Sequence, residues 1–277
     1  MRLKFVSDGK IIEFDGSGQC DGSIISVSGL EGVTRDYQTV KYVDVPGQIT
    51  VAENVLPREI VVKGDIFLKN SMSFSGYCNF FDQWGQLHIL KDTSRKKIAY
   101  KPVYFKRVGD NGDFVSFELK IICDFPYFSD SVNNFVDIYK RIDKVTGTFT
   151  LPKVFTERIT EADIMNMGQV VAEPVIELDC VAPGRYSGGI HIRNTSTGKT
   201  LVIKSNMISG EKIVFDVKNR TISSNKRQNC YGLLSDECTL ADFFLQKGLN
   251  KISIENKNDA ETVKVVINFE NLYTEAM

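Results

Sequence analysis

The chain has 277 residues, of which 42% are hydrophobic and 25% charged, and its formal net charge is −1. A chain of this length and composition can bury a large core in one or two domains without disulfide staples. The near-neutral charge excludes a field strong enough to draw the whole molecule to nucleic acid or to an anionic membrane.

The six cysteines form no pair with CxxC spacing, and most of them lie inside apolar patterns. We interpret them as reduced residues of a protein that is made in the cytoplasm. The first residues, Met1–Phe5, lack the apolar segment of a signal peptide. No run approaches the ~18 apolar residues of a spanning helix, so we expect neither a signal peptide nor a membrane span.

Short apolar runs at the start of the chain predict strands joined by tight turns. Residues 3–14 form a hairpin around Ser7–Lys10, and residues 24–27 form a further strand. Two alternating runs in residues 37–51, separated by Val45-Pro46-Gly47, predict a second hairpin. Its residues are polar enough to project into solvent.

The stretch from Leu56 to Ile66 predicts a half-buried strand, because apolar and charged residues alternate along it. Pro57 lacks a backbone donor and fits only at the first residues of such a strand or at an edge. Gly64 interrupts the apolar face, which indicates a bulge or the close approach of another backbone.

The hydrophobic period then changes. Phe74, Cys78 and Phe81 recur at the spacing of one helical face, with Tyr77 alongside. This predicts one amphipathic helix over about residues 72–83, with Ser71 as its N-cap. The pattern then returns to strands, at residues 87–90, 97–106 and 115–123.

Residues 129–168 show a looser pattern and mark the expected boundary between two domains, 1–140 and 141–277. Within this zone, residues 147–151 predict a strand, and a helical turn capped by Asp163 is expected after Thr160. Seven short strands at roughly ten-residue spacing follow: 175–181, 189–194, 200–204, 212–217, 220–223, 250–255 and 262–269. Turn sequences separate them, which is typical of an antiparallel sandwich.

No constellation of catalytic or metal-binding residues is apparent. His88 and His191 lie in strand patterns without Cys, Asp or Glu at ligand spacing. Gly198-Lys199-Thr200 lacks the first glycine of a phosphate-binding loop and precedes a strand, so we interpret it as a hairpin turn. We therefore predict a protein that is not an enzyme and that has no catalytic, cofactor-binding or metal-binding residues.

The order of the parts carries a family resemblance. The strand Leu56-Pro57-Arg58-Glu59-Ile60 precedes the aromatic helix, and the last strand of this half ends in Cys123-Asp124-Phe125-Pro126-Tyr127-Phe128. The second half carries Asn166-Met167-Gly168, Glu173-Pro174-Val175-Ile176 and Phe244-Leu245-Gln246-Lys247-Gly248-Leu249-Asn250-Lys251-Ile252. In this order they resemble the distal tail protein family of long-tailed phages, the siphovirus tail component, over nearly the whole chain. The chain departs from the family pattern at Phe125, which stands between the acidic residue and Pro126.

The resemblance implies a mainly β fold: an N-terminal sandwich or barrel-like domain with one α-helix and a projecting hairpin, and a galectin-like C-terminal β-sandwich. Six N-terminal domains would close into a ring, as a heterologous interface allows. The ring would join the tail tube protein to the tail-associated hub protein and to receptor-binding proteins. For the protein in solution, the alternatives are a hexamer, a two-ring dodecamer and a monomer. No cofactor, nucleic acid or membrane is implied, and the protein would be located at the virion tail tip.

Five residues are expected at or near the interface between subunits: Tyr37, Tyr42 and Val45 in the projecting hairpin, and Arg58 and Glu59 in the strand after it. Arg58 would form a charge-assisted pair with an acidic residue of a neighbouring subunit. The alternative is a salt bridge within the domain or simple solvation.

A carbohydrate-binding module or adhesin, which uses the C-terminal sandwich, is the second hypothesis. Sugars usually stack on an aromatic side chain with polar neighbours, and the single tryptophan, Trp84, lies outside that domain. The aromatic candidates inside it are Tyr186, Tyr231, Phe243 and Phe244, of which the two phenylalanines are expected to belong to the core.

Overall fold

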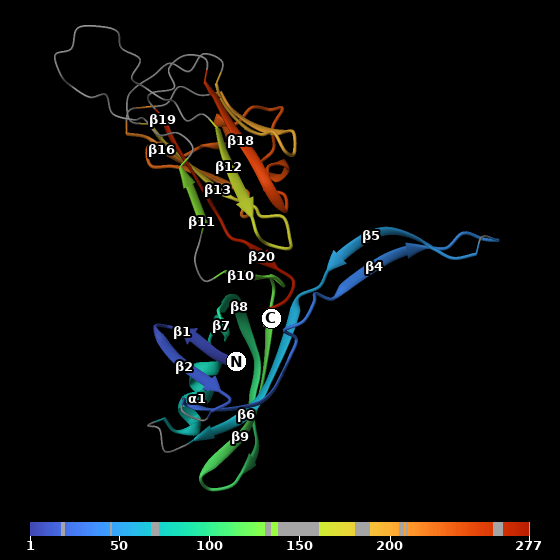
Figure 1. Ribbon diagram of the computed structural model, residues 1–277, viewed down its shortest axis with the longest axis vertical. Coiled ribbons are helices and arrows are strands. Elements are labelled where there is room, and N and C mark those ends of the chain that lie inside the picture. The colour runs from blue at the N-terminus through green and yellow to red at the C-terminus, as the bar shows by residue number, and fades with distance from the viewer. Residues whose placement is uncertain are drawn as a thin grey trace, which may run out of the picture. The chain divides into compact units, whose positions relative to one another are not determined.

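The computed structural model describes residues 1–17, 20–44, 46–67, 72–130, 134–137, 161–180, 189–204, 208, 210–256 and 263–276. The chain divides into two compact units, Met1–Ser131 together with Tyr273–Met277, and Val132–Leu272 (Figure 1). The predicted domain boundary between residues 140 and 141 lies outside the described residues. The return of the chain end to the first unit was not predicted.

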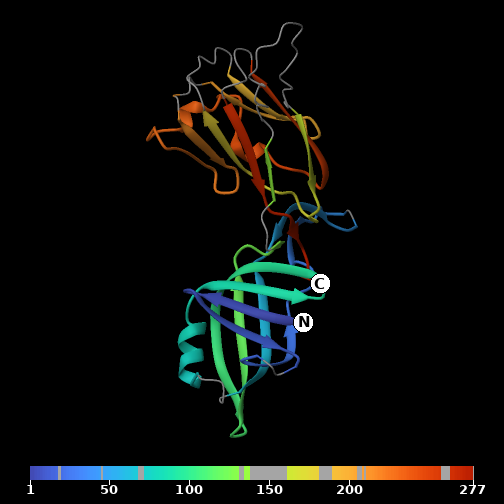
Figure 2. The ribbon, with the colours of Figure 1, turned by 60° about the vertical axis from the view of Figure 1, so that its left-hand side comes forward.

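Seven strands of the first unit close into a barrel-like sheet in the order β8-β7-β1-β2-β3-β6-β9, and β9 pairs with β8 to complete it (Figure 2). Neighbouring strands are antiparallel except β2 and β3. The strands are β1 (Arg2–Ser7), β2 (Lys10–Asp15), β3 (Gly22–Ser28), β6 (Arg58–Phe67), β7 (Gly85–Lys91), β8 (Ser94–Asp110) and β9 (Phe114–Cys123). The short strands β10 (Phe128–Asp130) and β20 (Leu272–Tyr273) extend the sheet beyond β8.

The alternating patterns of the sequence correspond to these strands because every second side chain enters the barrel. Aromatic rings fill much of its interior. Phe81 lies 5.2 Å from Phe5 and 4.9 Å from Phe105 between ring centroids, and Phe14 lies 5.0 Å from Phe117. Such pairs add to the stability gained from buried area alone.

The predicted helix is confirmed as α1 (Phe74–Phe81), which is shorter than expected. Its N-cap is Ser73, whose hydroxyl accepts a hydrogen bond from the Gly76 N–H at 3.3 Å. The predicted N-cap, Ser71, lies outside the described residues. The predicted stripe is confirmed in part: Tyr77 and Phe81 are buried, whereas Phe74 and Cys78 are only half-buried. Phe80, which was not predicted, is buried as well, so the buried face lies at i, i+3 and i+4 from Tyr77.

The strand predicted at Leu56–Ile66 is β6, and its position between β3 and β9 explains its sequence. A Cβ added at Gly64 would lie 2.1 Å from the Ser23 carbonyl oxygen, so the predicted close approach is confirmed. The register of β3 shifts between Ile24 and Ser26, opposite this glycine. The bulge therefore lies in the partner strand, and Gly64 makes room for it.

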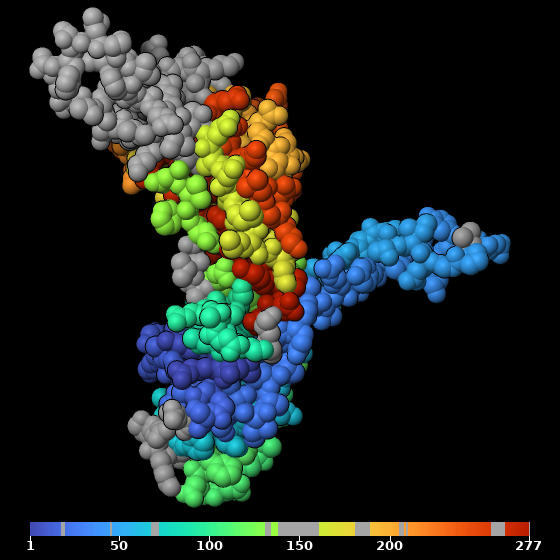
Figure 3. Space-filling model, in the orientation of Figure 1, coloured from blue at the N-terminus to red at the C-terminus, as the bar shows by residue number. Residues whose placement is uncertain are grey.

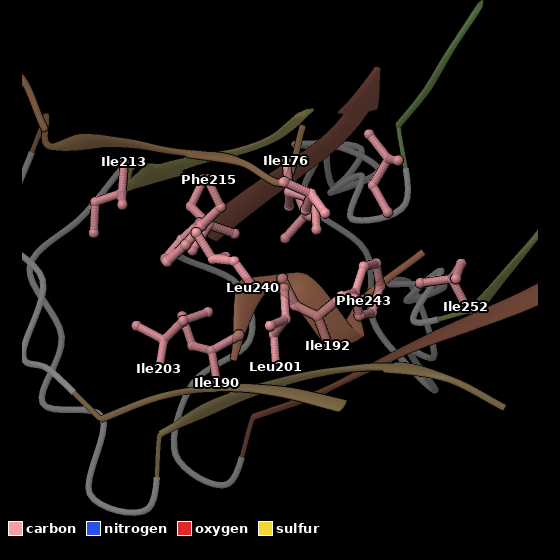
Figure 4. Packing of buried hydrophobic residues seen from close by; sticks show 14 of the residues in the cluster. Ile176, Ile190, Ile192, Leu201, Ile203, Ile213, Phe215, Leu240, Phe243 and Ile252 are labelled. Carbon is pink, nitrogen blue, oxygen red and sulfur yellow. The ribbon is translucent and has the colours of Figure 1, made fainter. Parts of the chain in front are cut away.

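The second unit consists of two antiparallel sheets with a shared core (Figure 4). One sheet has the order β11-β19-β13-β16-β17 and the other β12-β18-β14-β15. Side chains such as Phe215 from the first sheet and Ile192 from the second point toward each other, with Leu240 and Phe243 between them. The strands are β11 (Asn134–Asp137), β12 (Glu161–Asn166), β13 (Val175–Cys180), β14 (Ile190–Asn194), β15 (Lys199–Ile203), β16 (Lys212–Asp216), β17 (Thr221–Ser224), β18 (Gly248–Asn256) and β19 (Val263–Phe269).

All seven strands predicted for this region are present, and Gly198 turns between β14 and β15 with a φ of 71°. The helical turn predicted around Asp163 was wrong. Residues 161–166 form β12, paired with β18, because Ile164 and Asn166 alternate into the interior. The strand predicted at residues 147–151 lies outside the described residues.

A buried ion pair holds the loop before β16 to the segment after β17. The fully buried carboxylate of Glu211 lies 2.6 Å from Arg227 Nε. It also accepts hydrogen bonds from the Ser224 hydroxyl and the Ile208 N–H, both at 2.9 Å. Burial of the carboxyl opposes its ionisation, but these donors outweigh burial and lower the pKa of Glu211.

Replacing Arg227 by methionine should therefore destabilise the second unit by about 3 kcal/mol at neutral pH, because a buried carboxylate loses its counter-ion. The pKa of Glu211 is lower in the folded than in the unfolded chain. The ionised carboxylate therefore stabilises the fold at pH values above the unfolded pKa, and this stabilisation is lost as the pH falls through the folded pKa. Denaturant midpoints of wild type and Arg227→Met at about pH 7 and about pH 3 should show a gap that shrinks in acid, where Glu211 becomes protonated. The exposed Arg193→Met serves as control. A gap that is equal at both pH values would contradict this prediction.

Candidate assembly surface

The predicted projecting hairpin is confirmed as a two-stranded ribbon that leaves the barrel (Figure 1). It consists of β4 (Arg35–Val40) and β5 (Ile49–Val55), whose register runs from Arg35 opposite Val55 to Val40 opposite Ile49. In the described part of the chain, neither strand pairs with any other. The ribbon therefore presents two free backbone edges as well as two faces.

Apolar side chains lie on both faces of the ribbon. Paired residues of antiparallel strands share a face, and successive residues alternate between faces. The register shift lies in β5, where Val51 is the extra residue, so β4 keeps its alternation. Tyr37 therefore shares one face with the ion pair of Arg35 and Glu53, and Val40 and Ile49 lie on the other.

The apolar side chains of the ribbon are uncovered in the single chain. Tyr37, Val40, Ile49 and Val51 are 41–60% exposed, and Val43 beyond β4 is 88% exposed. On the side seen in the space-filling view, no second layer lies against the ribbon (Figure 3). An isolated two-stranded hairpin is marginally stable in water, and large exposed apolar faces are typical of interaction sites. The chemistry of the ribbon therefore favours contact with another molecule.

A pocket of about 420 Å³ lies at the base of the ribbon. Val33, Leu56, Pro57 and Ile122 line it with apolar side chains, and Glu59 is also in the lining. The Leu56 N–H donates to the Thr34 carbonyl oxygen at 2.9 Å, which closes the two strands where they leave the barrel. The exposed ribbon and this pocket together form what we call the assembly surface.

Arg58 stands beneath the assembly surface and is nearly fully buried. Its Nε donates to the Pro126 carbonyl oxygen at 2.7 Å. Its Nη1 donates to the carbonyl oxygens of Gly29 and Glu31, and its Nη2 donates to that of Thr274 at 2.7 Å. The guanidinium carbon also lies 4.5 Å from the centre of the Phe128 ring.

Through these contacts the guanidinium binds carbonyl oxygens of its own chain. Burial is the main influence on Arg58 and lowers its pKa, although the value for arginine is high enough for the group to stay charged. Arg58 thus ties three segments of the first unit to the start of β6, among them the segment of Thr274. The free carboxylate of a neighbouring subunit is not needed to explain this arginine.

The other predicted interface residues have different environments. Tyr37 and Tyr42 are 50% and 57% exposed, in and just beyond β4. Glu59 is exposed on β6 and lies 2.8 Å from Lys120 of β9. Val45 lies outside the described residues. Ile49 and Val51 of the same ribbon are exposed apolar residues that were not predicted as interface residues.

The described residues contain no group of three His, Cys, Asp or Glu side chains placed to hold a metal ion. His88 lies in β7 and His191 in β14. The pKa of His88 is lowered by burial and by the neighbouring Lys4 and Lys97. Within the described part of the chain, no helix is long and apolar enough to cross a membrane.

Comparison with known proteins identifies the class to which this architecture is similar. Residues 167–273 match the model of a family described as the siphovirus-type tail component, C-terminal domain. No curated protein sequence matches the chain.

Two solved structures share the fold along nearly the full length of the chain. SPP1 Dit (gp 19.1), described as a paradigm of the hub adsorption apparatus in phages that infect Gram-positive bacteria, is 13% identical, with a TM-score of 0.67. A chain of the phage P2 baseplate in its activated conformation with calcium is 10% identical, with a TM-score of 0.50. Each match covers 97% of this chain and 98% of the other.

The resemblance to the siphovirus tail component family that the sequence motifs indicated is therefore confirmed. The family is one of structural tail and hub proteins and not of enzymes. The match also agrees with a mainly β chain that contains a closed, barrel-like region of seven strands.

Proposed function

We propose that the protein is a structural component of the phage or prophage distal tail whose first unit assembles into a hexameric ring. The observation that carries the proposal is the set of exposed apolar side chains on the β4–β5 ribbon, in a chain whose fold matches a hub protein. A hairpin with so many exposed apolar side chains needs a second surface to cover it.

A ring follows if the ribbon of one copy contacts a different surface of the next. Such a head-to-tail interface closes into a ring when the rotation between copies divides a full turn. Tyr37, Tyr42, Val45 and Glu59 remain our proposed interface residues, with Arg58 acting beneath them as an internal support. The pocket lined by Leu56 and Ile122 is a surface of the right chemistry to receive apolar side chains from a neighbour.

The second unit, from about residue 141 in our proposed division, would occupy the outside of the ring as a galectin-like sandwich. The ring would join the tail tube protein on one side to the tail-associated hub protein on the other. Receptor-binding proteins would attach at its periphery, so the protein would be located at the virion tail tip. This proposal needs no cofactor and no catalytic residue.

Negative-stain electron microscopy of the purified full chain tests the proposal, together with light scattering after gel filtration. We expect particles with a central hole and a mass of six times 31.2 kDa, or of twelve times for two stacked rings. A monodisperse monomer at the highest soluble concentration, without ring particles, would count against a ring built by this chain alone.

A further inference from the structure

A second candidate site lies in the second unit, far along the chain from the ribbon. It is a pocket of about 400 Å³ between the edge strand β17 and two short 3₁₀ helices, η1 (Tyr231–Leu233) and η2 (Leu240–Asp242). The buried side chains of Ile222 and Leu240 belong to its lining and to the core of the unit. A cavity of this size matches the lower end of small-ligand pockets, which span roughly 300–1,000 Å³.

Tyr231 provides a fixed aromatic surface in this pocket. Its side chain is 61% exposed, which is unusual for so large an aromatic group. Its hydroxyl donates to the Arg220 carbonyl oxygen at 2.8 Å, so the ring is anchored at its far end. Arg220 is itself held by an ion pair with Glu173. The aromatic surface is thus oriented before any ligand arrives, which reduces the entropic cost of binding.

Polar groups line the same pocket. Asp236 is exposed and lies 2.8 Å from Lys204 Nζ, and this hydrogen bond lowers the pKa of its carboxyl. The carboxylate therefore stays ionised and can accept further hydrogen bonds. Among the described residues, the side-chain hydroxyls of Ser235 and Thr239 form no hydrogen bond within the chain. The carboxylate and the two hydroxyls thus provide three hydrogen-bond acceptors beside the aromatic ring, and the hydroxyls can also donate.

We propose that this pocket is a saccharide subsite that binds one pyranose ring, stacked on Tyr231 and hydrogen-bonded to Asp236, Ser235 and Thr239. A pyranose has an apolar face of C–H groups and a rim of hydroxyls. The apolar face suits the tyrosine ring, and the rim suits a carboxylate and two hydroxyls that both donate and accept. An apolar peptide side chain would satisfy the ring but would leave the carboxylate without a new partner.

The proposal is independent of ring assembly, because no residue of the pocket belongs to the ribbon or to its base. It predicts a binding function for the second unit that the assembly of the first unit does not require. Failure of one proposal would leave the other standing.

Saturation-transfer NMR on the full chain tests the subsite, with the methyl glycosides of glucose, galactose and N-acetylglucosamine as probes. We expect transfer to at least one probe, strongest at the protons of the face that stacks on the ring. Tyr231→Ala and Asp236→Asn should each weaken binding at least tenfold. Tyr231→Phe, which keeps the ring and loses only the anchoring hydroxyl, should retain most of the signal.

Asp242→Asn is the matched control, since Asp242 is an exposed aspartate of η2 outside the pocket lining. It should leave binding unchanged. Circular dichroism and thermal unfolding of each variant would show that the fold persists, as expected for exposed side chains. Absence of transfer to all three probes, or equal transfer in wild type and Tyr231→Ala, would overturn the proposal.

Discussion

Replacing Arg58 by methionine should lower the free energy of unfolding of the first unit by about 4 kcal/mol. The substitution leaves four carbonyl oxygens near a buried site without their donor, and each unsatisfied buried group costs about 1–3 kcal/mol. Partial access of water through the pocket that Arg58 lines keeps the total near the lower end of that range. The cost is large because a single side chain serves four carbonyls in three separate segments.

Denaturant unfolding followed by tryptophan fluorescence measures this effect selectively. The single tryptophan, Trp84, lies in the first unit, so its signal reports on that unit. Arg58→Lys should cost about half as much, because an ammonium group has three donors on one atom and cannot span all four carbonyls.

The matched control is Arg35→Met, which removes an exposed arginine of the ribbon paired with Glu53. Exposed ion pairs of this kind contribute about 0–1 kcal/mol. A loss of less than about 1 kcal/mol for Arg58→Met would show that water replaces the guanidinium without penalty.

The same substitution should loosen the end of the chain. Thr274 contributes one of the four carbonyls, and the buried Ala276 donates its N–H to the Leu30 carbonyl oxygen at 3.0 Å. Without Arg58, the Tyr273–Met277 segment loses one of its attachments to the barrel. Limited proteolysis with carboxypeptidase should then remove these residues faster than from wild type.

The strands of both units were predictable because each has one buried face. A period of two in the sequence translates directly into the alternation of β6 or β9, and β9 alternates between buried and half-buried positions along its full length. Gly64 could be interpreted for the same reason, since a missing side chain on a buried face indicates a neighbour close by. A feature that follows from the local pattern of residues, such as strand alternation, can be predicted from one sequence.

The role of Arg58 could not be found in this way. Its partners are backbone carbonyls of Gly29, Glu31, Pro126 and Thr274, and a carbonyl has the same chemistry whichever residue carries it. Nothing in the sequence marks them as acceptors for one arginine. The return of Tyr273–Met277 to the first unit was missed because five residues are too few to show a period.

The helical turn expected at Asp163 failed for a different reason. A short polar segment fits either a capped turn or an edge strand, and tertiary pairing decides between them. The pairing of β12 with β18 settles residues 161–166 as a strand. The ribbon is intermediate: its strands were predicted, but which residues share a face becomes visible only when the register shift at Gln38 and Thr39 is known.

Lysine substitutions at two exposed apolar residues of the ribbon, Tyr37→Lys together with Val51→Lys, should abolish assembly of the full chain. Complete burial of an apolar side chain contributes about 1.5–3 kcal/mol, and Tyr37, Val40, Ile49 and Val51 are about half exposed in the single chain. Covering them would therefore contribute about 4 kcal/mol for each interface, which corresponds to roughly a thousandfold in affinity. Light scattering should give the mass of one chain in place of a ring.

The control places the same charges at polar positions of the ribbon, with Gln38→Lys together with Thr50→Lys. These substitutions remove no apolar side chain, so Tyr37 and Val51 remain free to contact a neighbour. The net charge changes equally in both double variants, so general repulsion between chains cannot account for a difference. We expect the control to form rings like wild type. Equal loss of assembly in both variants would assign the effect to charge, and rings in both would remove Tyr37 and Val51 from the interface.

An assembly built in this way uses a feature that the single chain leaves incomplete. The ribbon has neither a core of its own nor a covered face, and its strands pair only with each other within the described residues. Its order in a monomer rests on its own ladder and on the hydrogen bond at Leu56, so it should exchange amide hydrogens quickly there. Protection of β4 and β5 that rises in wild type with protein concentration, and that stays low in the Tyr37→Lys and Val51→Lys double variant, would connect the ordering of the ribbon to the ring. High protection that does not depend on protein concentration would show that the ribbon is stable alone. It would count against the proposal that ring assembly orders the ribbon.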